Sequence, residues 1–290
     1  MLTILHASDL QIGKPYRTWA ADAMVRTAEE VRPDVVVIAG DLTQRAKPRE
    51  YRIAREILER FGDTPVVVTP GNHDVPVYRV WERLLAPYRN WRRYISRDLD
   101  SVHRIPGAMI VALNSSAPYR TIVAGRLRPW QVELAREAFA TSDEEEVRVL
   151  VVHHHFVPTE SGHGGTPIPN AARYLQAFTE MGVDLILGGH IHQTRVLWSQ
   201  GEPAWTDAPF PLVACGTTTS GRGRAPELGV NSLNVVRVDR ECIEVTPYLL
   251  RVREGGFEPE TPTRIPRWRM AHERGGADAS RSTEGPRGAL

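Results

Sequence analysis

Acidic, amide and imidazole side chains recur directly after short apolar segments of this chain. Asp9 follows the segment LTILHAS and lies two residues before Gln11, and Asp41 closes the segment DVVVIAGD. A carboxylate at the end of a buried strand needs either a network of hydrogen bonds or a cation. The pattern occurs at five predicted strand ends, which carry Asp9, Asp41, the run Asn72, His73 and Asp74, the run His153, His154 and His155, and the pair His190 and His192.

These five strand ends are expected to meet at one site, because ligands bind at the carboxyl edge of open α/β sheets. Any one of the residues alone is more simply explained as a cap or a satisfied loop residue. Burying two aspartates and at least four imidazoles together would leave several polar groups short of partners. A metal centre removes that cost, so the set as a whole predicts one.

The types of ligand narrow the choice of metal. Carboxylate oxygen, amide oxygen and imidazole nitrogen without a thiolate suit two divalent transition-metal ions such as Mn, Fe or Zn better than Ca. One tetrahedral ion cannot use so many ligands, so two ions roughly 3.5–4 Å apart with one bridging carboxylate are expected. Such a pair clamps the oxygens of an in-line displacement, most often at phosphorus. The expected ligands are Asp9, Asp41, Asn72, His153, His190 and His192, with Gln11 as a further candidate.

The elements that must position these residues alternate in character. Short apolar runs rich in Val and Ile predict strands that are covered on both faces. Segments with helical periodicity lie between them, which predicts an α/β domain. The predicted helices cover residues 17–31, 48–62, 128–140 and 170–182.

The pattern changes after about residue 195. Strands joined by short turns follow, and they predict a second, more antiparallel sheet that completes the same domain, residues 1–254. Residues 255–290 are rich in Gly, Pro, Arg and Ser, and a loosely ordered C-terminal tail is expected there.

Composition excludes several classes of partner. The formal net charge is +1, which gives no electrostatic reason to expect nucleic acid or an anionic membrane. The two cysteines, Cys215 and Cys242, fit neither a disulfide framework nor a zinc site rich in cysteine. No run is long enough to span a membrane, and no signal-peptide pattern opens the chain. A soluble, cytoplasmic protein is therefore expected, and its oligomeric state is left open.

The motifs SDLQ, GDLT, GNHD, HHH and GHIH, in this order, resemble those of the calcineurin-like metallophosphoesterase superfamily. The resemblance runs from about Leu2 to Arg251. GDLT, TPGNHD and the later stretches CGTTTSGRGR and NSLNVVRVD most resemble the bacterial branch that includes class III cyclic-nucleotide phosphodiesterases. The resemblance implies a four-layer αββα sandwich with two central mixed sheets. It also implies a phosphodiesterase that hydrolyses a small phosphodiester, a cyclic nucleotide or similar, through a metal-bridging hydroxide.

The resemblance also assigns roles to individual residues. Asp41 would bridge the two ions, Asp9 and His192 would hold one of them, and Asn72, His153 and His190 would hold the other. His73 would be catalytic, acting on the substrate by stabilising charge or protonating the leaving oxygen. Asp74 would complete the catalytic pair by hydrogen-bonding His73 and fixing its tautomer.

Two positions stay open. The family motif is Asp-x-His, whereas this chain has Gln11, whose amide oxygen would bind these ions more weakly than imidazole. Gln11 then either marks a weaker or partly occupied metal position or only hydrogen-bonds nearby. In the triple histidine, the family form favours His153 as the ligand over His154, and His154 and His155 would shape the rim.

Two other functions remain as alternatives. One is a non-catalytic scaffold with a degraded first metal position, and the other is a nuclease acting on DNA ends. The intact GNHD motif opposes the scaffold, and the balanced charge opposes the nuclease. Substrate selection is expected from the segments at 77–95, 115–125 and 158–170, where 77–95 forms either a cap that offers arginine and aromatic groups or an ordinary amphipathic surface helix.

Overall fold

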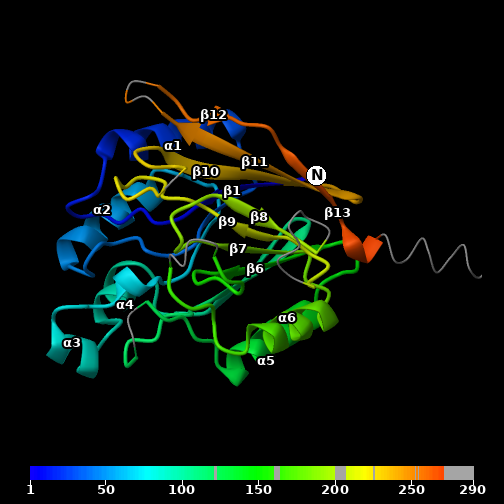
Figure 1. The fold of residues 1–290 in the computed structure, drawn as a ribbon, viewed down its shortest axis with the longest axis horizontal. Helices are drawn as coiled ribbons and strands as arrows, with labels where there is room; N and C mark the ends of the chain where they lie inside the picture. The colour runs from blue at the N-terminus through cyan, green and yellow to red at the C-terminus, as the bar shows by residue number, and fades with distance from the viewer. Residues whose placement is uncertain are drawn as a thin grey trace, which may run out of the picture.

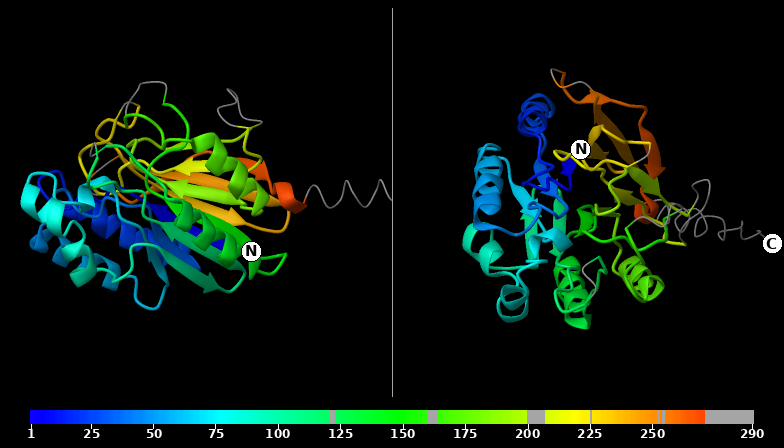
Figure 2. Two further views of the ribbon diagram at one scale, coloured as in Figure 1. Left: turned by 90° about the horizontal axis from the view of Figure 1, so that it is seen from below. Right: turned by 60° about the vertical axis from the view of Figure 1, so that its left-hand side comes forward.

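Two β-sheets lie face to face between helices in the computed structural model of the chain (Figure 1). The helices α1 and α2 lie on one side of the strands, and α5 and α6 lie on the other (Figures 1 and 2). The structure describes residues 1–120, 123–159, 164–199, 207–224, 226–251, 253 and 255–270.

The first sheet has the order β12-β11-β10-β1-β2-β3, and β13 also pairs with β11. The strands β1, β2 and β3 are parallel, so their carboxyl ends share one edge, whereas β10 runs antiparallel to β1. The strands are β1 (Leu2–Ala7), β2 (Val35–Ile38), β3 (Val66–Val68), β10 (Asn231–Val238), β11 (Cys242–Leu250), β12 (Glu258–Pro259) and β13 (Thr263–Pro266).

The second sheet has the order β4-β5-β6-β7-β9-β8. Its central strands β5, β6, β7 and β9 are parallel, and the edge strands β4 and β8 are antiparallel to their neighbours. Both sheets are therefore mixed. The strands are β4 (Ser101–Ile105), β5 (Ala108–Leu113), β6 (Val147–Val152), β7 (Leu185–Gly188), β8 (Arg195–Leu197) and β9 (Leu212–Ala214).

Three apolar layers hold the sandwich together. One lies between the sheets, where Val and Ile side chains from both fill the space. A second joins α1, α2 and α4 to the first sheet, and a third joins α5 and α6 to the second. The predicted αββα architecture is therefore confirmed. The helices are α1 (Thr18–Val31), α2 (Pro48–Glu59), α3 (Val80–Leu85), α4 (Arg89–Tyr94), α5 (Pro129–Ala140) and α6 (Ala171–Glu180).

The strands after residue 195 do not form a sheet of their own, which corrects the prediction. Instead, β8 and β9 extend the second sheet, while β10 and β11 extend the first. The strand β10 pairs with β1 over five positions, from Leu2 opposite Val238 to His6 opposite Asn234. This partner is more than 200 residues away along the chain, and the local apolar pattern of a strand does not specify such a pairing.

The prediction of a loosely ordered tail is wrong for residues 255–270. The strand β13 pairs with β11 over four positions, with Ile265 opposite Ile243. Phe257, Ile265 and Met270 are buried, so this segment contributes to the core although its sequence is rich in proline and charge. Residues 271–290 lie outside the described residues. The order continues past the predicted domain boundary at residue 254.

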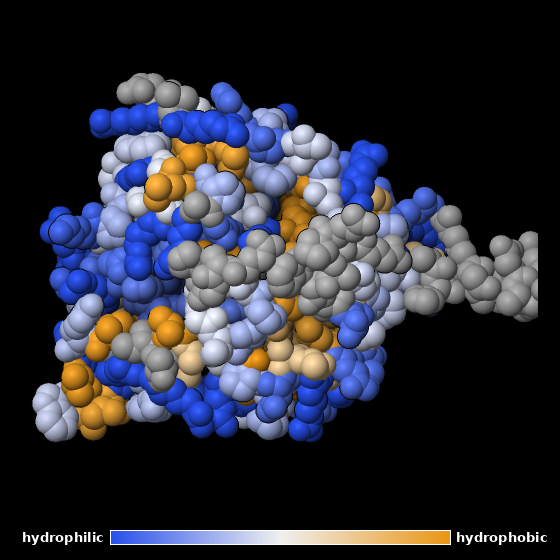
Figure 3. Space-filling model, viewed as in Figure 1, coloured by the Kyte–Doolittle hydropathy of each residue, from blue (hydrophilic) through white to orange (hydrophobic). Residues whose placement is uncertain are grey.

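The segment 77–95 does not form one long helix. The two short helices α3 and α4 occupy it, and Pro87 lies between them, where its ring disfavours a helical residue before it. No residue of α3 is buried, and Trp81 and Leu85 are 77% and 81% exposed. Figure 3 shows the resulting apolar patch at the lower left, over α3.

Within the described part of the chain, no helix is long and apolar enough to cross a membrane. Both cysteines are free. Cys215 is fully buried, which raises the pKa of its thiol, and Cys242 is partly buried.

The free energy of unfolding should depend on pH through His6, a residue of β1 that is completely buried. Burial lowers the pKa of His6 to about 3, only partly opposed by a hydrogen bond with the backbone of Gly188. The unfolded chain binds a proton at this histidine below its pKa of 6.5, whereas the folded protein does so only near pH 3. The folded protein therefore loses no stability through His6 above pH 6.5 and becomes progressively less stable as the pH falls from 6.5 towards 3. At pH 5.5 the loss is about 1.4 kcal/mol relative to neutral pH.

Urea unfolding at pH 7.5 and pH 5.5 tests this expectation in wild type and in His6→Gln. The fall in free energy of unfolding between the two pH values should be smaller by about 1.4 kcal/mol in the variant, because only the His6 contribution is removed. An equal fall in both proteins would contradict the assignment.

Candidate metal centre

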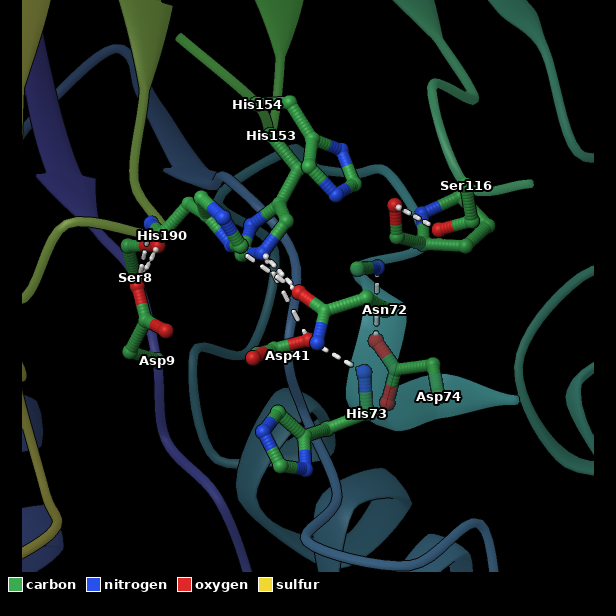
Figure 4. Close-up of polar contacts among 12 residues, drawn as sticks. Ser8, Asp9, Asp41, Asn72, His73, Asp74, Ser116, His153, His154 and His190 are labelled. Carbon is green, nitrogen blue, oxygen red and sulfur yellow. Dashed lines mark hydrogen bonds and ion pairs between the residues drawn. The ribbon is translucent and has the colours of Figure 1, made fainter. Parts of the chain in front are cut away.

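The turns after β1, β2, β3, β6 and β7 bring the predicted ligands to one place. Figure 4 shows five of them, Asp9, Asp41, Asn72, His153 and His190. The two sheets contribute to it jointly, since β1, β2 and β3 belong to the first and β6 and β7 to the second. All the expected ligands are buried, with at most 7% of any residue exposed. They are Asp9, Gln11, Asp41, Asn72, His153, His190 and His192.

The backbone is strained at these residues. Eight described residues other than glycine have positive φ, and five of them are candidate ligands. A left-handed conformation costs on the order of 1–2 kcal/mol for a residue with a Cβ. Such strain clusters at functional sites, where the surrounding structure holds it in place. The five are Asp9, Gln11, Asp41, His190 and His192, with φ between 47° and 73°.

Two glycines allow the turns to approach closely. A Cβ atom on Gly71 would overlap the carboxylate of Asp41, and one on Gly189 would overlap the hydroxyl of Ser8. Ser8 in turn donates a hydrogen bond of 2.7 Å to Asp9 Oδ2. Any larger residue at either glycine would therefore displace a candidate ligand.

Backbone carbonyls orient the three histidines. His153 Nδ1 donates to Ala39 O at 2.7 Å, His190 Nε2 to Gly164 O at 2.8 Å, and His192 Nδ1 to Arg222 O at 3.0 Å. A carbonyl oxygen can only accept, so these contacts fix which ring nitrogen carries the hydrogen. The other nitrogen of each ring is left with a lone pair and faces the cluster, which is the usual second-shell arrangement of a metal-binding histidine.

One half of the cluster forms around the side-chain oxygen of Asn72. Asn72 Oδ1 lies 2.9 Å from His190 Nδ1 and 3.3 Å from His153 Nε2 (Figure 4). His153 Nε2 is also 3.5 Å from Asp41 Oδ1. Asp9, Asp41 and His153 have ligand atoms within 4.8 Å of one another, so Asp41 connects this half to the other.

The other half contains Asp9, His192 and Gln11. His192 Nε2 lies 3.1 Å from Asp9 Oδ1. Gln11 Nε2 lies 3.1 Å from His192 Nε2, 3.3 Å from Asp41 Oδ2 and 3.4 Å from Asp9 Oδ1. Gln11 Oε1 accepts from the Ser220 hydroxyl at 3.2 Å. The Gln11 amide thus lies among the candidate metal ligands of this half, and its nitrogen faces the carboxylates of Asp9 and Asp41.

Burial and mutual charge set the protonation of the cluster. Burial lowers the pKa of His190 to about 3, only partly opposed by its hydrogen bond with the backbone of Gly164, so its ring is neutral near pH 7. Burial alone would raise the pKa of Asp9, but the contacts with His192, His153 and the Ser8 hydroxyl together outweigh it and hold the pKa below its usual value. Burial and the negative charge of Asp41 raise the pKa of Asp74 to about 7.

The donor set fits divalent metal ions. Two buried carboxylates, an amide oxygen and three imidazole nitrogens with lone pairs converge, and these donors bind ions such as Mn, Fe and Zn. A cation would also satisfy Asp9 and Asp41, which are at most 1% exposed.

The predicted hydrogen bond between Asp74 and His73 is wrong. The Asp74 carboxylate accepts from the backbone N–H groups of Leu42, Thr43 and Gly71 at 2.9–3.1 Å. His73 Nδ1 donates instead to the Gln44 carbonyl oxygen at 3.0 Å. A buried carboxylate is satisfied by such backbone donors, so Asp74 holds the turns that carry Asp41 and His73 without fixing the His73 tautomer.

The three consecutive histidines have different surroundings. The His153 ring is aimed at Asn72, whereas the His154 ring points away from Asn72 and lies against His190, with ring centroids 4.5 Å apart (Figure 4). His154 Nδ1 lies 2.7 Å from the Ser115 hydroxyl, and its Nε2 has no partner among the described residues. His155 stacks on His190 with ring centroids 5.6 Å apart. The geometry favours His153 as the ligand.

The loop that follows β9, residues 215–221, supports the site, and its residues are not among the predicted site residues. The hydroxyls of Thr217 and Thr219 donate to the carbonyl oxygens of Asp9 and Leu10 at 2.9 and 2.8 Å. The same loop supplies Ser220 to Gln11. The threonine run in CGTTTSGRGR is the signal for this function, since hydroxyls in succession can bond an adjacent backbone. Of the predicted rim loop at 158–170, residues 160–163 lie outside the described residues.

Fold and donor set together define a protein of the αββα class with a cluster of candidate metal ligands at the carboxyl edge of its sheets. The family model for calcineurin-like phosphoesterases matches residues 2–194. The chain belongs to this family, as the resemblance in its motifs predicted.

Several bacterial proteins are similar in sequence. A 3',5'-cyclic adenosine monophosphate phosphodiesterase, CpdA, of Haemophilus influenzae is 30% identical over 164 residues, which cover 55% of each chain. A cAMP/cGMP dual specificity phosphodiesterase of Mycobacterium tuberculosis is 27% identical over 254 residues, covering 80% of this chain and 75% of that protein. A probable cyclic nucleotide phosphodiesterase of Psychrobacter is 26% identical over 193 residues, covering 64% and 54%. The chain thus spans about half the length of the Haemophilus and Psychrobacter proteins.

Solved structures share the fold. A purple acid phosphatase from yellow lupin superposes with a TM-score of 0.64 at 12% identity, covering 93% of this chain and 55% of that one. A dimetal phosphatase from Danio rerio gives a TM-score of 0.60 at 13% identity, covering 92% and 99%. At these identities the likeness concerns the fold alone.

Proposed function

We propose that this protein is a metal-dependent phosphodiesterase acting on a small phosphodiester, with a cyclic nucleotide as the substrate class. The observation that carries the proposal is the convergence of the buried donors at one sheet edge, each histidine presenting one lone pair to the cluster. The relatives named as cyclic nucleotide phosphodiesterases support the substrate class.

The chain's donors divide into two sets for two ions. Asn72, His153 and His190 would hold one ion, Asp9 and His192 would hold the other, and Asp41 would serve both. Divalent ions at such a centre polarise a phosphoryl oxygen and lower the pKa of water. We propose manganese for the first tests, because carboxylate and amide oxygens suit it.

His73 is placed to act on the substrate. Its backbone N–H donates to Asp41 Oδ1 at 2.8 Å, which fixes the ring beside the cluster. The hydrogen on Nδ1 is held by the Gln44 carbonyl, so Nε2 is the ring atom that can exchange a proton with a substrate oxygen. In its protonated form the ring also offers positive charge to the phosphoryl group. The proposed reaction needs no Ser or Cys nucleophile, because the metal ions would activate water.

A panel of substrates tests the assignment on manganese-loaded protein. Cyclic AMP, bis-p-nitrophenyl phosphate, p-nitrophenyl phosphate, a glycerophosphodiester and single-stranded DNA are compared by kcat/KM. We expect the two diesters cyclic AMP and bis-p-nitrophenyl phosphate to be the best substrates. The chain is also 25% identical over 237 residues to a DNA double-strand break repair protein, Mre11, of Aeropyrum pernix, covering 74% of this chain and 53% of that protein. A preference for DNA would replace the small-diester proposal by a nuclease.

Gln11 should make one of the metal positions weak. Replacing it by histidine offers imidazole nitrogen where the chain has an amide, and imidazole binds borderline ions more strongly. We expect Gln11→His to lower the half-saturating manganese concentration about tenfold, equivalent to about 1.4 kcal/mol in binding free energy. Titration calorimetry on metal-stripped protein measures it independently of turnover. Gln11→Glu serves as a control that keeps the length of the side chain, and unchanged affinity in Gln11→His would show that residue 11 lies outside the coordination sphere.

A further inference from the structure

We propose that Arg222 binds the phosphoryl group of the substrate and determines its affinity for anions. The inference rests on the proposed function and extends it to a residue outside every motif that predicts the metal centre. No described carboxylate pairs with the Arg222 guanidinium. Its positive charge is therefore available to a ligand.

The guanidinium lies beside the residue that faces the substrate. Arg222 Nη1 is 3.3 Å from His73 Nε2 and 3.4 Å from Gln44 Oε1. Because a guanidinium can only donate, His73 Nε2 accepts this contact from the arginine. The guanidinium thus lies next to His73 Nε2, the ring atom that a substrate oxygen would approach.

The backbone of Arg222 is fixed to the metal centre. Its carbonyl oxygen accepts from His192 Nδ1 at 3.0 Å, and its N–H donates to the Ser220 hydroxyl at 3.4 Å. Ser220 also donates to Gln11. Arg222 therefore orients the candidate ligand His192 through its backbone and contacts His73 through its side chain. These contacts fix the position of the guanidinium relative to the candidate metal ligands.

The chemistry of the side chain suits a phosphodiester. Guanidinium presents parallel N–H donors that match two phosphate oxygens, and hydrogen bonds between charged groups are about twice as strong as neutral ones. Among the described residues, the side-chain contacts of the Arg222 guanidinium are with a ring nitrogen and an amide oxygen, which are weaker acceptors than a phosphate anion. An arriving phosphodiester would therefore take over the guanidinium and leave His73 Nε2 free for proton exchange.

Substitutions that remove the charge test this role. Arg222→Gln keeps polar contacts without charge, Arg222→Lys keeps charge without the fork, and Arg224→Gln is the matched control two residues away. We expect Arg222→Gln to lower kcat/KM for bis-p-nitrophenyl phosphate about 10- to 100-fold and to weaken inorganic phosphate binding similarly. Arg222→Lys should recover part of both, and Arg224→Gln should change neither by more than about twofold.

Manganese affinity, measured by calorimetry, separates this role from a structural one. It should stay within about twofold in Arg222→Gln, since the backbone carbonyl that holds His192 remains. Loss of manganese affinity, or an unchanged affinity for phosphate, would overturn the inference. If wild type hydrolyses none of the diesters, the proposed function fails, while phosphate binding to manganese-loaded wild type and Arg222→Gln still decides the role of Arg222.

Discussion

Asp41→Asn is expected to lower diester hydrolysis by at least about a thousandfold and to remove most of the manganese affinity. The Asp41 carboxylate is 1% exposed, contacts both halves of the cluster and accepts the backbone N–H of His73. An amide in its place loses the negative charge that two cations would share and turns a donor towards them. Steady-state kinetics with manganese titration, together with calorimetry, measures both effects.

Asp34→Asn is the matched control, because Asp34 directly precedes β2 whereas Asp41 follows it. Its exposed carboxylate accepts from the backbone N–H of Thr3, at 2.7 Å and far along β2 from Asp41. Activity and manganese affinity should stay close to wild type. Near-normal hydrolysis in Asp41→Asn would show that the reaction does not use the predicted centre.

Asp184→Asn is expected to reduce the free energy of unfolding by about 3–5 kcal/mol. Asp184 is fully buried at the start of β7 and pairs with two arginines of the C-terminal segment. Arg267 Nε lies 2.9 Å from Oδ1, and Arg269 Nη2 lies 2.7 Å from Oδ2. Without the carboxylate, Arg267 would be a buried charge with no counter-ion, since it is only 2% exposed.

Asp143→Asn is the control for this loss of stability. The Asp143 side chain is 79% exposed and pairs with Arg104 at 2.9 Å, and an exposed pair contributes at most about 1 kcal/mol. Urea unfolding at neutral pH compares the two variants with wild type. Equal stability of Asp184→Asn and Asp143→Asn would contradict a structural role for the C-terminal segment.

The sequence predicts the interior of this fold well because the central strands are continuous apolar runs between amphipathic helices. It misses strands at the sheet edges, among them β4 and β13. The strand β4, SVHRI, has polar residues at three of its five positions, and β13, TRIP, is short and contains proline. Edge strands are held by a partner on one side and by a few buried residues such as Ile265, so their own apolar pattern is weak.

In the candidate site, too, one part is predictable from the sequence and another is not. Its ligand residues are predictable because each directly follows an apolar run, and parallel strands carry such positions to one edge. The supporting contacts are not predictable from that pattern. Asp74 bonds to backbone groups of two turns, and Arg222 comes from a loop 30 residues beyond His192. Both contacts depend on how loops cross the sheet edge, which residue type and spacing do not encode.

Hydrolysis of bis-p-nitrophenyl phosphate by metal-stripped protein, titrated with manganese, tests the central claim most directly. Wild type and Asn72→Ala are compared, because Asn72 Oδ1 joins His153 to His190 at the centre of one half of the site. The proposed metal-dependent diesterase requires turnover that rises with manganese in wild type and is abolished in Asn72→Ala. No hydrolysis by wild type at any manganese concentration, or equal turnover in both proteins, would contradict the proposed function.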